Sequence, residues 1–248
     1  METPKVSVII PTYNSEKTIE KALLSVLIQT YCNVECLVID GSSKDKTIDI
    51  VQKFEDKIVF ISEKDNGIYH AMNKGIELSS GEWLLFLGSD DELEFNGIEK
   101  LIAAAEDADI VYGSTTIVYE SGQTKKRYCR DFKIIPVHSA AIHQSVIMRK
   151  SVIQKLNGFD ERYKLLADYD ITLRAYLKGY RFKQINDFIS RFSNTGISSY
   201  NFKGPKERMN IHIANNSMKF PRLYFIKDII HLFLAQIKNI FLEKMNWV

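Results

Sequence analysis

The stretch VSVIIPTYN, residues 6–14, contains the pattern on which the fold depends. Residues 5–10 (KVSVII) form a short apolar run rich in β-branched residues, which is typical of a buried strand. We expect Pro11 to end this strand, because proline offers no backbone N–H to a neighbouring strand. Thr12, Tyr13 and Asn14 then stand at the carboxyl end of the strand.

The same unit recurs along the first hundred residues. Apolar runs that predict further strands lie at residues 35–39 (ECLVI), 58–61 and 83–87 (WLLFL). Helical patterning follows each strand, from Ile19 onward and at residues 45–54, 68–78 and about 95–105. Strands that alternate with helices predict βαβ units and a parallel sheet. Strands that are apolar throughout predict helices on both faces. The expected fold class is therefore α/β, with a mostly parallel, open, twisted, Rossmann-like sheet.

The alternation weakens after residue 108. We expect strands at residues 109–112, 115–119, 126–128, 141–148 and 181–185, with a hairpin turn at residues 120–123. Helices are expected at residues 166–177, 205–218 and 221–244. These patterns divide the chain into a body, residues 1–200, and a helical tail, residues 201–248.

Charge and apolar patterning exclude several classes of protein. The chain carries 33 Lys/Arg against 31 Asp/Glu, which is too balanced for a dedicated nucleic-acid binder. The tail is basic, with eight Lys/Arg and three Asp/Glu, and suggests a partner of its own. Three cysteines without CxxC spacing and an N-terminus without signal-peptide character predict a cytoplasmic protein. Residues 221–248 lack an 18-residue apolar run, so they are expected to lie on the inner face of a membrane or to pack as a helix.

Polar residues follow each of the first four predicted strands. Besides residues 11–14, these are residues 40–43 (DGSS), 63–67 (EKDNG) and 88–91 (GSDD). The carboxyl ends of parallel strands form the ligand edge of an open α/β sheet, so a ligand site is predicted there. Turns favour the same residue types, which leaves simple loop composition as the alternative. No GxGxxG turn and no GxxxxGK[ST] loop is present, which argues against a dinucleotide or P-loop site.

Asp90 and Asp91 are the sharpest single feature. Adjacent carboxylates repel one another unless positive charge lies between them. Mg²⁺ or Mn²⁺ chelated by a diphosphate supplies that charge, because these ions prefer hard oxygen ligands. The alternative is a helix N-cap before Leu93.

Four segments in order, VSVIIPTYN, LVIDGSSKDKT, KDNGIYHAMNKGI and GEWLLFLGSDD, resemble the inverting family 2 glycosyltransferases with the GT-A fold. The resemblance covers most of residues 4–190 and implies that residues 1–200 bind a nucleotide-sugar and catalyse transfer. It implies a metal site at Asp90 and Asp91. The residues that it implies for the nucleotide or its sugar are Pro11, Thr12, Tyr13, Asn14, Asp40, Asp65, Asn73 and Asp90. Many relatives have Asp where this chain has Gly88, so a third acidic ligand is missing.

The family's second signature is commonly Glu-Asp-x-Asp at the start of a helix. Here the segment reads LADYD, residues 166–170, so Ala167 replaces the Glu and Asp168 is the implied general base. The alternative is an acidic helix start favoured by the helix dipole. Asp170 points about 200° away from Asp168 on a helix and is expected to face outward or to cap the structure. The resemblance also implies that His143 and Gln144 contact the acceptor or the diphosphate, although a lone histidine on a strand is often structural.

The sequence therefore predicts a metal-dependent, inverting glycosyltransferase, either a hexosyl- or an N-acetylhexosaminyltransferase. It is expected to move a sugar from a nucleotide-diphospho-sugar, a UDP-sugar, to a hydroxyl of a glycan or lipid-linked acceptor in surface polysaccharide biosynthesis. Two rivals remain open. A glycoside hydrolase needs two carboxylates about 5–9.5 Å apart and no nucleotide, and Gly88 and Ala167 leave room for a non-catalytic sugar-nucleotide-binding protein.

Overall fold

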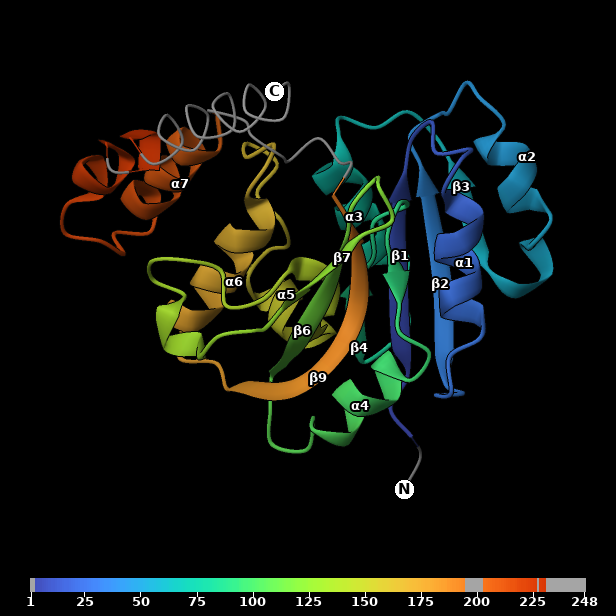
Figure 1. Ribbon diagram of the computed structural model, residues 1–248, viewed down its shortest axis with the longest axis horizontal. Helices are drawn as coiled ribbons and strands as arrows, with labels where there is room; N and C mark the ends of the chain where they lie inside the picture. The colour runs from blue at the N-terminus through green and yellow to red at the C-terminus, as the bar shows by residue number, and fades with distance from the viewer. Residues whose placement is uncertain (1–2, 195–202, 227, 231–248) are drawn as a thin grey trace, which may run out of the picture. The chain divides into compact units, whose positions relative to one another are not determined.

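The computed structural model describes residues 3–194, 203–226 and 228–230 (Figure 1). The chain divides into two compact units, Met1–Gly196 and Ile197–Val248. The first unit contains the sheet, and each unit is described by itself below.

The first unit begins with the predicted alternation of strands and helices. Its elements are β1 (Val6–Thr12), α1 (Ile19–Leu27), β2 (Val34–Asp40), α2 (Thr47–Gln52), a 3-10 turn (Glu55–Lys57), β3 (Val59–Ser62), α3 (Ile68–Leu78) and β4 (Trp83–Phe86). These four strands are mutually parallel, and Thr12, Asp40 and Ser62 are aligned at their carboxyl ends. The βαβ prediction is therefore confirmed.

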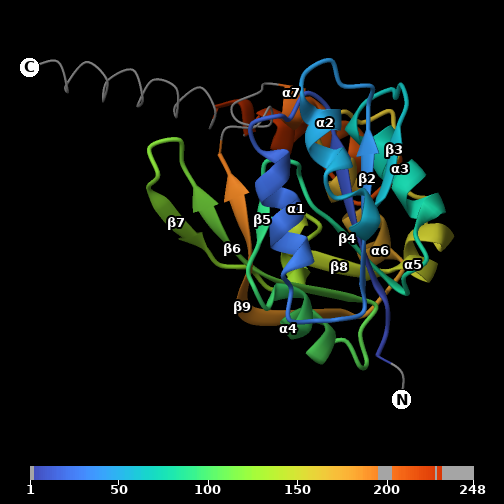
Figure 2. The same ribbon diagram turned by 90° about the vertical axis from the view of Figure 1, so that its right-hand side faces the viewer.

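The rest of the unit extends the sheet with mixed pairing. Its elements are β5 (Glu92–Leu93), α4 (Gly97–Ala103), β6 (Ile110–Val118), β7 (Thr124–Arg127), 3-10 turns η2 (Phe132–Ile134) and η3 (His143–Ser145), β8 (Val146–Arg149), α5 (Lys150–Lys155), α6 (Ala167–Leu177) and β9 (Phe182–Ser193). Within the described residues the strand order is β3-β2-β1-β4-β8-β6-β9-β5, with β7 paired to β6. Figure 2 shows β6, β7 and β9 on the opposite side of the first unit from β2 and β3.

Helices cover both faces of the sheet, as the apolar strands predict. Val8 and Ile10 of β1 belong to a buried cluster with Ile19 and Leu23 of α1. The intervening Ile9 faces α3 instead, where a Cβ on Gly75 would lie 2.4 Å from the Ile9 side chain. Alternate residues of a strand point to opposite faces, so β1 is buried on both sides.

Several boundaries differ from the sequence prediction, and four of them concern the strands around the site. Pro11 does not end β1, which continues to Thr12. The C=O of Ile9 accepts a hydrogen bond from the N–H of Leu87, just after β4, so the backbone of Pro11, two residues later, also points toward the β4 side. The pairing of β1 with β4 ends at Ile9 and Phe86, so the missing N–H of Pro11 removes no hydrogen bond between these strands. The strand expected at 141–148 begins only at Val146, after the η3 turn. The strands expected at 109–112 and 115–119 form one strand, β6, and the strand expected at 181–185 extends to Ser193.

The second unit is helical where it is described. It contains α7 (Lys203–Ala214), and residues 221–226 and 228–230 are also helical. Most of the helix expected at 221–244 lies outside the described residues. Among the helices that are described, none has the length and apolarity needed to cross a membrane.

Candidate functional site

Side-chain hydrogen bonds join the ends of the parallel strands into one edge. The N–H of Asn14, after β1, donates to Ser43 Oγ, after β2, at 2.8 Å. Ser62 Oγ, at the end of β3, donates to Asp40 Oδ2 at 2.6 Å. Ser15 Oγ and Ser89 Oγ, after β1 and β4, lie 2.8 Å apart. The structure therefore brings the polar turns of the first four strands together.

The turn after β1 exposes one ring and buries one hydroxyl. Pro11 and Thr12 are buried, and Thr12 Oγ1 has no hydrogen-bond partner within the described residues. The Tyr13 side chain is 60% exposed. Asn14 adopts a left-handed backbone, φ 49°, and its Oδ1 accepts from the N–H of Lys44 at 2.8 Å. An unsatisfied buried hydroxyl beside an exposed aromatic ring is an arrangement that a ligand can complete.

Asp40 and Asp65 occupy neighbouring loops with different exposure. Asp40 is fully buried, and its carboxylate accepts hydrogen bonds from Ser43 and Ser62. Asp65 is half-buried and lies against Gly41, where a Cβ would stand 2.6 Å from Asp65 Oδ2. Asp65 is therefore the more accessible carboxylate, and the contact of Asp40 with a nucleotide base stays a prediction.

Asn73 holds a distant loop in place. Its Nδ2 donates to Phe159 O at 3.0 Å and to Glu161 Oε1 at 2.9 Å, and its Oδ1 accepts from Phe159 N at 2.9 Å. Both ends of the amide are thus engaged by the loop that leads to α6. The structure gives Asn73 a positioning contact, and its predicted proximity to the nucleotide or sugar remains untested.

Asp90 and Asp91 fold back over Gly88. A Cβ on Gly88 would lie 2.4 Å from Asp91 Oδ2 and 3.0 Å from Asp90 Oδ1. The two carboxylates therefore occupy the space that a side chain at position 88 would need. The missing third acid is consistent with this packing, because an Asp at position 88 would displace Asp91.

The pair carries negative charge that the surrounding protein does not neutralise. Asp91 is 1% exposed, and burial together with the charge of Asp90 raises the pKa of Asp91 to about 7. Burial also raises the pKa of Asp90. Among the described residues neither carboxylate forms an ion pair with Lys or Arg. Such a pair fits a divalent cation, although the described part of the chain has no group of three or more Asp, Glu, His or Cys side chains arranged to hold a metal ion.

The η3 turn connects this pair to the other side of the site. Gln144 Nε2 donates to Asp91 Oδ2 at 2.5 Å, and the backbone N–H of Ser193 donates to Asp91 Oδ1 at 2.8 Å. Gln144 thus fixes an acidic side chain in the structure, whereas the sequence predicts a contact with the acceptor or diphosphate. Ser193 was not identified from the sequence, because a backbone donor at the end of β9 leaves no signal in the residue type.

His143, the neighbouring residue in η3, is held between aromatic rings. Its imidazole stacks on Phe86, with ring centroids 5.4 Å apart, and meets Phe159 edge-on at 5.9 Å. Nε2 is buried and has no hydrogen-bond partner within the described residues. Burial lowers the pKa of His143, although the charge of Asp168 acts in the opposite direction. The imidazole is therefore neutral at pH 7.

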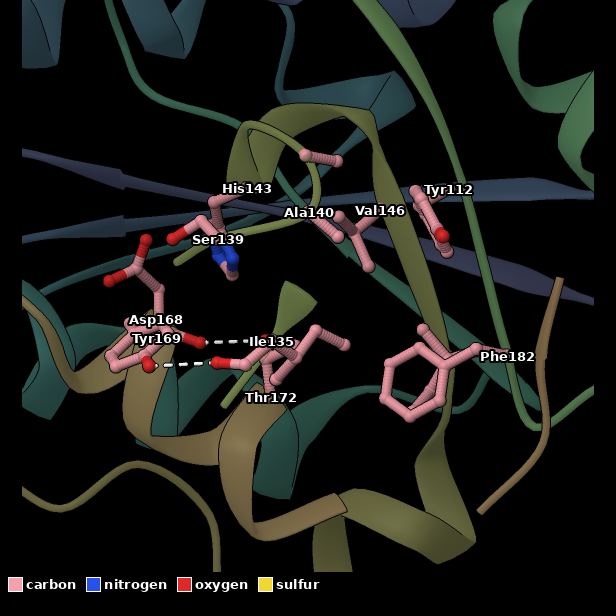
Figure 3. A pocket seen from close by; sticks show the side chains of 12 residues that line it. Tyr112, Ile135, Ser139, Ala140, His143, Val146, Asp168, Tyr169, Thr172 and Phe182 are labelled. Carbon is pink, nitrogen blue, oxygen red and sulfur yellow. Dashed lines mark hydrogen bonds between the residues drawn. The ribbon is translucent and has the colours of Figure 1, made fainter. Parts of the chain in front are cut away.

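Asp168 lies in the first turn of α6 and is half-buried. Tyr69 Oη, from the first turn of α3, donates to Asp168 Oδ1 at 3.2 Å. Figure 3 shows the Asp168 carboxylate and the His143 imidazole at the same end of a pocket. The sequence carries no signal for this role of Tyr69, because its partner is 99 residues away along the chain. Ala167 is fully buried, at the position where relatives commonly have Glu.

The expectation that Asp170 faces outward is wrong. Asp170 is 2% exposed, and its Oδ2 accepts from Arg174 Nε at 2.7 Å. The Arg174 guanidinium also donates to the carbonyl groups of Leu156 and Gly158. The buried Asp170 carboxylate therefore orients Arg174, and Arg174 in turn holds the loop before α6.

The glycosyl transferase family 2 pattern matches residues 7–180. A PGL/p-HBAD biosynthesis glycosyltransferase of Mycobacterium bovis is 29% identical over 209 residues, which cover 81% of this chain and 78% of that protein. An uncharacterized glycosyltransferase of Rickettsia typhi is 32% identical over 183 residues, which cover 68% of this chain and 58% of that protein.

Two solved structures have a similar fold. S. aureus TarS 1–349 in complex with UDP-GlcNAc matches with a TM-score of 0.69 at 23% identity, covering 84% of this chain and 66% of that chain. The mannosyltransferase PcManGT from Pyrobaculum calidifontis, in complex with GDP-Man and Mn²⁺, matches with a TM-score of 0.67 at 17% identity, covering 93% and 71%. The chain spans less than two thirds of the TarS chains that it matches. The predicted fold class, a GT-A-like α/β sheet, is confirmed.

The family pattern extends from β1, through the strand ends and the two acidic sites, to the end of α6. The same segments carry the motifs that the sequence shares with such enzymes. The chain belongs to glycosyl transferase family 2.

Proposed function

We propose that the protein transfers a sugar from a nucleotide-diphospho-sugar, a UDP-sugar, to an acceptor hydroxyl with inversion at the anomeric carbon. The observation that carries this proposal is the η3 turn, because its side chains Gln144 and His143 lie next to two different acidic sites. Gln144 holds the Asp91 carboxylate, and His143 lies beside Asp168. The pair Asp90 and Asp91 is thus available to hold the cation of a donor diphosphate, and Asp168 is available to accept the proton of an acceptor hydroxyl.

The donor side uses the joined strand ends. The exposed ring of Tyr13 and the unpaired hydroxyl of Thr12 suit a base and a ribose. Asp65, which is accessible above Gly41, suits the ribose or the sugar. The TarS structure with UDP-GlcNAc supports a UDP-sugar as the donor through the shared fold.

Asp90 and Asp91 are the residues that would hold Mg²⁺ or Mn²⁺. The bound metal would supply positive charge to the leaving diphosphate. Gln144 and the Ser193 N–H keep the Asp91 carboxylate oriented. The Asp90 carboxylate accepts a hydrogen bond from its own backbone N–H. The mannosyltransferase structure with Mn²⁺ supports this assignment by analogy.

Asp168 is the proposed general base. It accepts the proton of the acceptor hydroxyl as the acceptor oxygen bonds to the anomeric carbon and the bond from that carbon to the diphosphate breaks. Tyr69 fixes one carboxylate oxygen by its 3.2 Å hydrogen bond, which leaves the other oxygen for the acceptor. Asp91 is unsuited to this role, because each of its oxygens accepts a hydrogen bond and the cation that it would hold would occupy its remaining lone pairs.

The proposed acceptor is a glycan or lipid-linked hydroxyl, and the proposed setting is surface polysaccharide assembly at the cytoplasmic side of a membrane. The second unit supports the membrane part of this proposal. Its described residues expose the large apolar side chains of Phe220, Leu223, Ile226 and Ile230, and the tail is net basic. Apolar and basic side chains together suit an anionic lipid surface.

A thermal-shift panel tests the proposed function. UDP, UDP-hexoses, UDP-N-acetylhexosamines and GDP-mannose are each added with Mn²⁺ or with EDTA. A ligand at 100 times its Kd adds about 2.7 kcal/mol to the free energy of unfolding, so a UDP-sugar with Mn²⁺ should raise Tm clearly. A protein that no nucleotide stabilises, with or without Mn²⁺, is not a nucleotide-sugar transferase.

A further inference from the structure

A cluster of buried hydroxyl groups joins the η3 turn to two strands of the sheet. Ser145, the last residue of η3, is fully buried, as is Ser190 of β9, and Thr115 of β6 is 1% exposed. Ser145 Oγ lies 2.6 Å from Thr115 Oγ1 and 2.6 Å from Ser190 Oγ. It also donates to the carbonyl oxygen of Ser114 at 3.1 Å. Ser145 is therefore the centre of a contact among three elements that are far apart in the sequence.

The hydroxyl of Ser145 uses all of its hydrogen-bonding capacity in this cluster. A hydroxyl has one hydrogen to donate and can accept two hydrogen bonds. The hydrogen of Ser145 goes to the carbonyl oxygen of Ser114. Thr115 and Ser190 are therefore the donors toward Ser145 Oγ. A buried polar network that is fully satisfied is rigid, so β6 and β9 together fix the position of η3.

The cluster lies where the pairing of β6 with β9 is irregular. The register shifts on both sides of Ser114, and β9 advances from Phe188 to Ser190 while β6 advances by a single residue. Such β-bulges re-aim side chains and are frequent beside active sites. Here the shift places Ser190 opposite Thr115, and both hydroxyls reach Ser145.

Two of the groups that donate to Asp91 come from the elements that this cluster joins. Gln144 directly precedes Ser145 in η3, and Ser193 lies at the end of β9, shortly after Ser190. Gln144 Nε2 and the Ser193 N–H donate to different oxygens of Asp91, at 2.5 Å and 2.8 Å. The position of η3 relative to β9 therefore decides whether both donors can hold the carboxylate at the same time.

We propose that Ser145 is a positioning residue for the cation site of Asp90 and Asp91. Its hydroxyl would not touch the cation, and its hydrogen bonds to β6 and β9 place η3 so that Gln144 orients the Asp91 carboxylate. Removal of a group that orients a metal ligand typically weakens metal binding by about 10–100-fold. This inference rests on the proposed function and deepens it by naming a residue outside the site that sets the cation affinity.

Binding of Mn²⁺ to the full chain with saturating UDP, followed by electron paramagnetic resonance, tests this role without measuring turnover. Ser145→Ala removes the central hydroxyl, but the hydroxyls of Thr115 and Ser190 lie 3.3 Å apart and can still bond to each other. We therefore expect a folded variant with a lower Tm and a Kd for Mn²⁺ about tenfold above that of wild type. Ser190→Ala removes only the contact with β9 and should change the Kd in the same direction.

Ser79→Ala is the matched control. Ser79 is also buried, 4% exposed, and its hydroxyl donates to Ile76 O at 2.8 Å. It precedes β4, whereas Asp90 and Asp91 follow that strand. The control should lower Tm without changing the Kd for Mn²⁺, which separates a loss of stability from a loss of positioning.

A double-mutant cycle with Gln144→Ala shows whether Ser145 acts through Gln144. Gln144→Ala alone should raise the Kd for Mn²⁺ by about tenfold or more. Adding Ser145→Ala should raise it by less than about twofold further, because the side chain that Ser145 positions is already absent. If Ser145→Ala does not fold, Ser190→Ala takes its place in the cycle.

The outcomes separate this inference from the proposed function. If both serine variants bind Mn²⁺ as wild type does, or if the effects of the serine and glutamine changes multiply in full, Ser145 has a structural role only and the donor proposal stands. If wild type itself binds UDP but no Mn²⁺, the cation site of the proposed function fails, and the role of Ser145 fails with it.

Discussion

At the residue scale, Asp168 is the carboxylate on which turnover should depend. General-base catalysis typically contributes about 10²–10⁴ in rate. Asp168→Asn keeps the size of the side chain and can still hydrogen-bond Tyr69 but cannot accept a proton. We expect kcat to fall by about that factor while the Kd for the UDP-sugar, measured by calorimetry, stays near wild type.

Asp49→Asn is the matched control, because Asp49 is an exposed carboxylate on α2 and the change is the same. It should leave kcat and Kd unchanged. If Asp168→Asn keeps more than about a tenth of wild-type kcat with the true acceptor, the base is another group and His143 is the next to test.

Asp91→Asn separates metal binding from folding. Asp91 is buried beside Asp90, and its pKa is raised to about 7, so its charge is unfavourable without a cation. Removing that charge should leave Tm unchanged or raise it, while Mn²⁺-dependent binding of UDP weakens. Calorimetry with Mn²⁺ or EDTA and thermal melts measure the two effects. Equal UDP affinity of wild type and variant in both conditions would rule out Asp91 as a metal ligand.

The part of the site that is formed by residues adjacent in the sequence could be predicted. Asp90 and Asp91 adjoin an apolar strand, so their repulsion is visible in the sequence itself. The contact between Gln144 and Asp91 could not be predicted, because the two residues are 53 positions apart in the sequence and only the folded sheet brings them together. The outward direction predicted for Asp170 is wrong, because helical geometry gives the direction of a side chain relative to its neighbours but does not show that Arg174 forms an ion pair with it.

At the scale of elements, Asn73 joins α3 to the loop before α6. Its amide makes three hydrogen bonds to Phe159 and Glu161. Asn73→Ala leaves the Phe159 N–H and C=O without these partners, at about 1–3 kcal/mol for each group that stays buried. We expect a lower Tm and, because the loop leads to Asp168, a lower kcat. A variant with wild-type Tm would show that the loop is held by other contacts.

Glu35, in β2, fastens the amino-terminal ends of β1 and β2 to the turn before β4. It pairs with Lys5 at 2.8 Å and accepts from the Ser80 N–H at 2.5 Å, and Ser7 Oγ also donates to it. Burial acts to raise the pKa of Glu35, but these hydrogen bonds outweigh it and lower the pKa from 4.5 to about 2.

The unfolded chain therefore takes up a proton at Glu35 before the folded chain does as pH falls. The stabilisation is present above pH 4.5 and is lost as the pH falls toward 2. Glu35→Gln should lower the free energy of unfolding at pH 7 and flatten its dependence between those pH values, measured by urea unfolding. Glu20→Gln, at an exposed position on α1, is the control. A pH dependence that Glu35→Gln leaves unchanged would contradict this account.

Elements with a clear period were predictable, and those without one were not. The range predicted for α3, residues 68–78, matches the structure. β9 was predicted too short, because FKQINDFISRFS has no continuous apolar run and its outer part is recognised only by pairing with β6. The η3 turn was predicted as strand because AIHQSVIM is apolar on average, whereas its hydrogen bonds form a 3-10 turn.

At the scale of the whole molecule, charge is unevenly distributed between the parts of the chain. Residues 201–248 carry a net charge of +5, which leaves −3 for the rest of the chain. An acidic body and a basic tail experience opposite forces near an anionic surface. The proposed membrane association should therefore depend on the tail and on ionic strength, because the Debye length falls to about 3 Å at 1 M salt.

Substituting the exposed apolar residues of the second unit tests this dependence in the full chain. Leu223 is 62% exposed and Ile226 is 53% exposed, so Leu223→Glu with Ile226→Glu should not disturb packing within the unit. Wild type should float with anionic vesicles at low salt, and the double variant should stay in the lower fraction, because it loses apolar contact and adds negative charge. Leu24→Glu with Ile28→Glu makes the same change in and just after α1 of the body and should still float. If wild type does not float, or if both double variants float equally, the second unit has another partner.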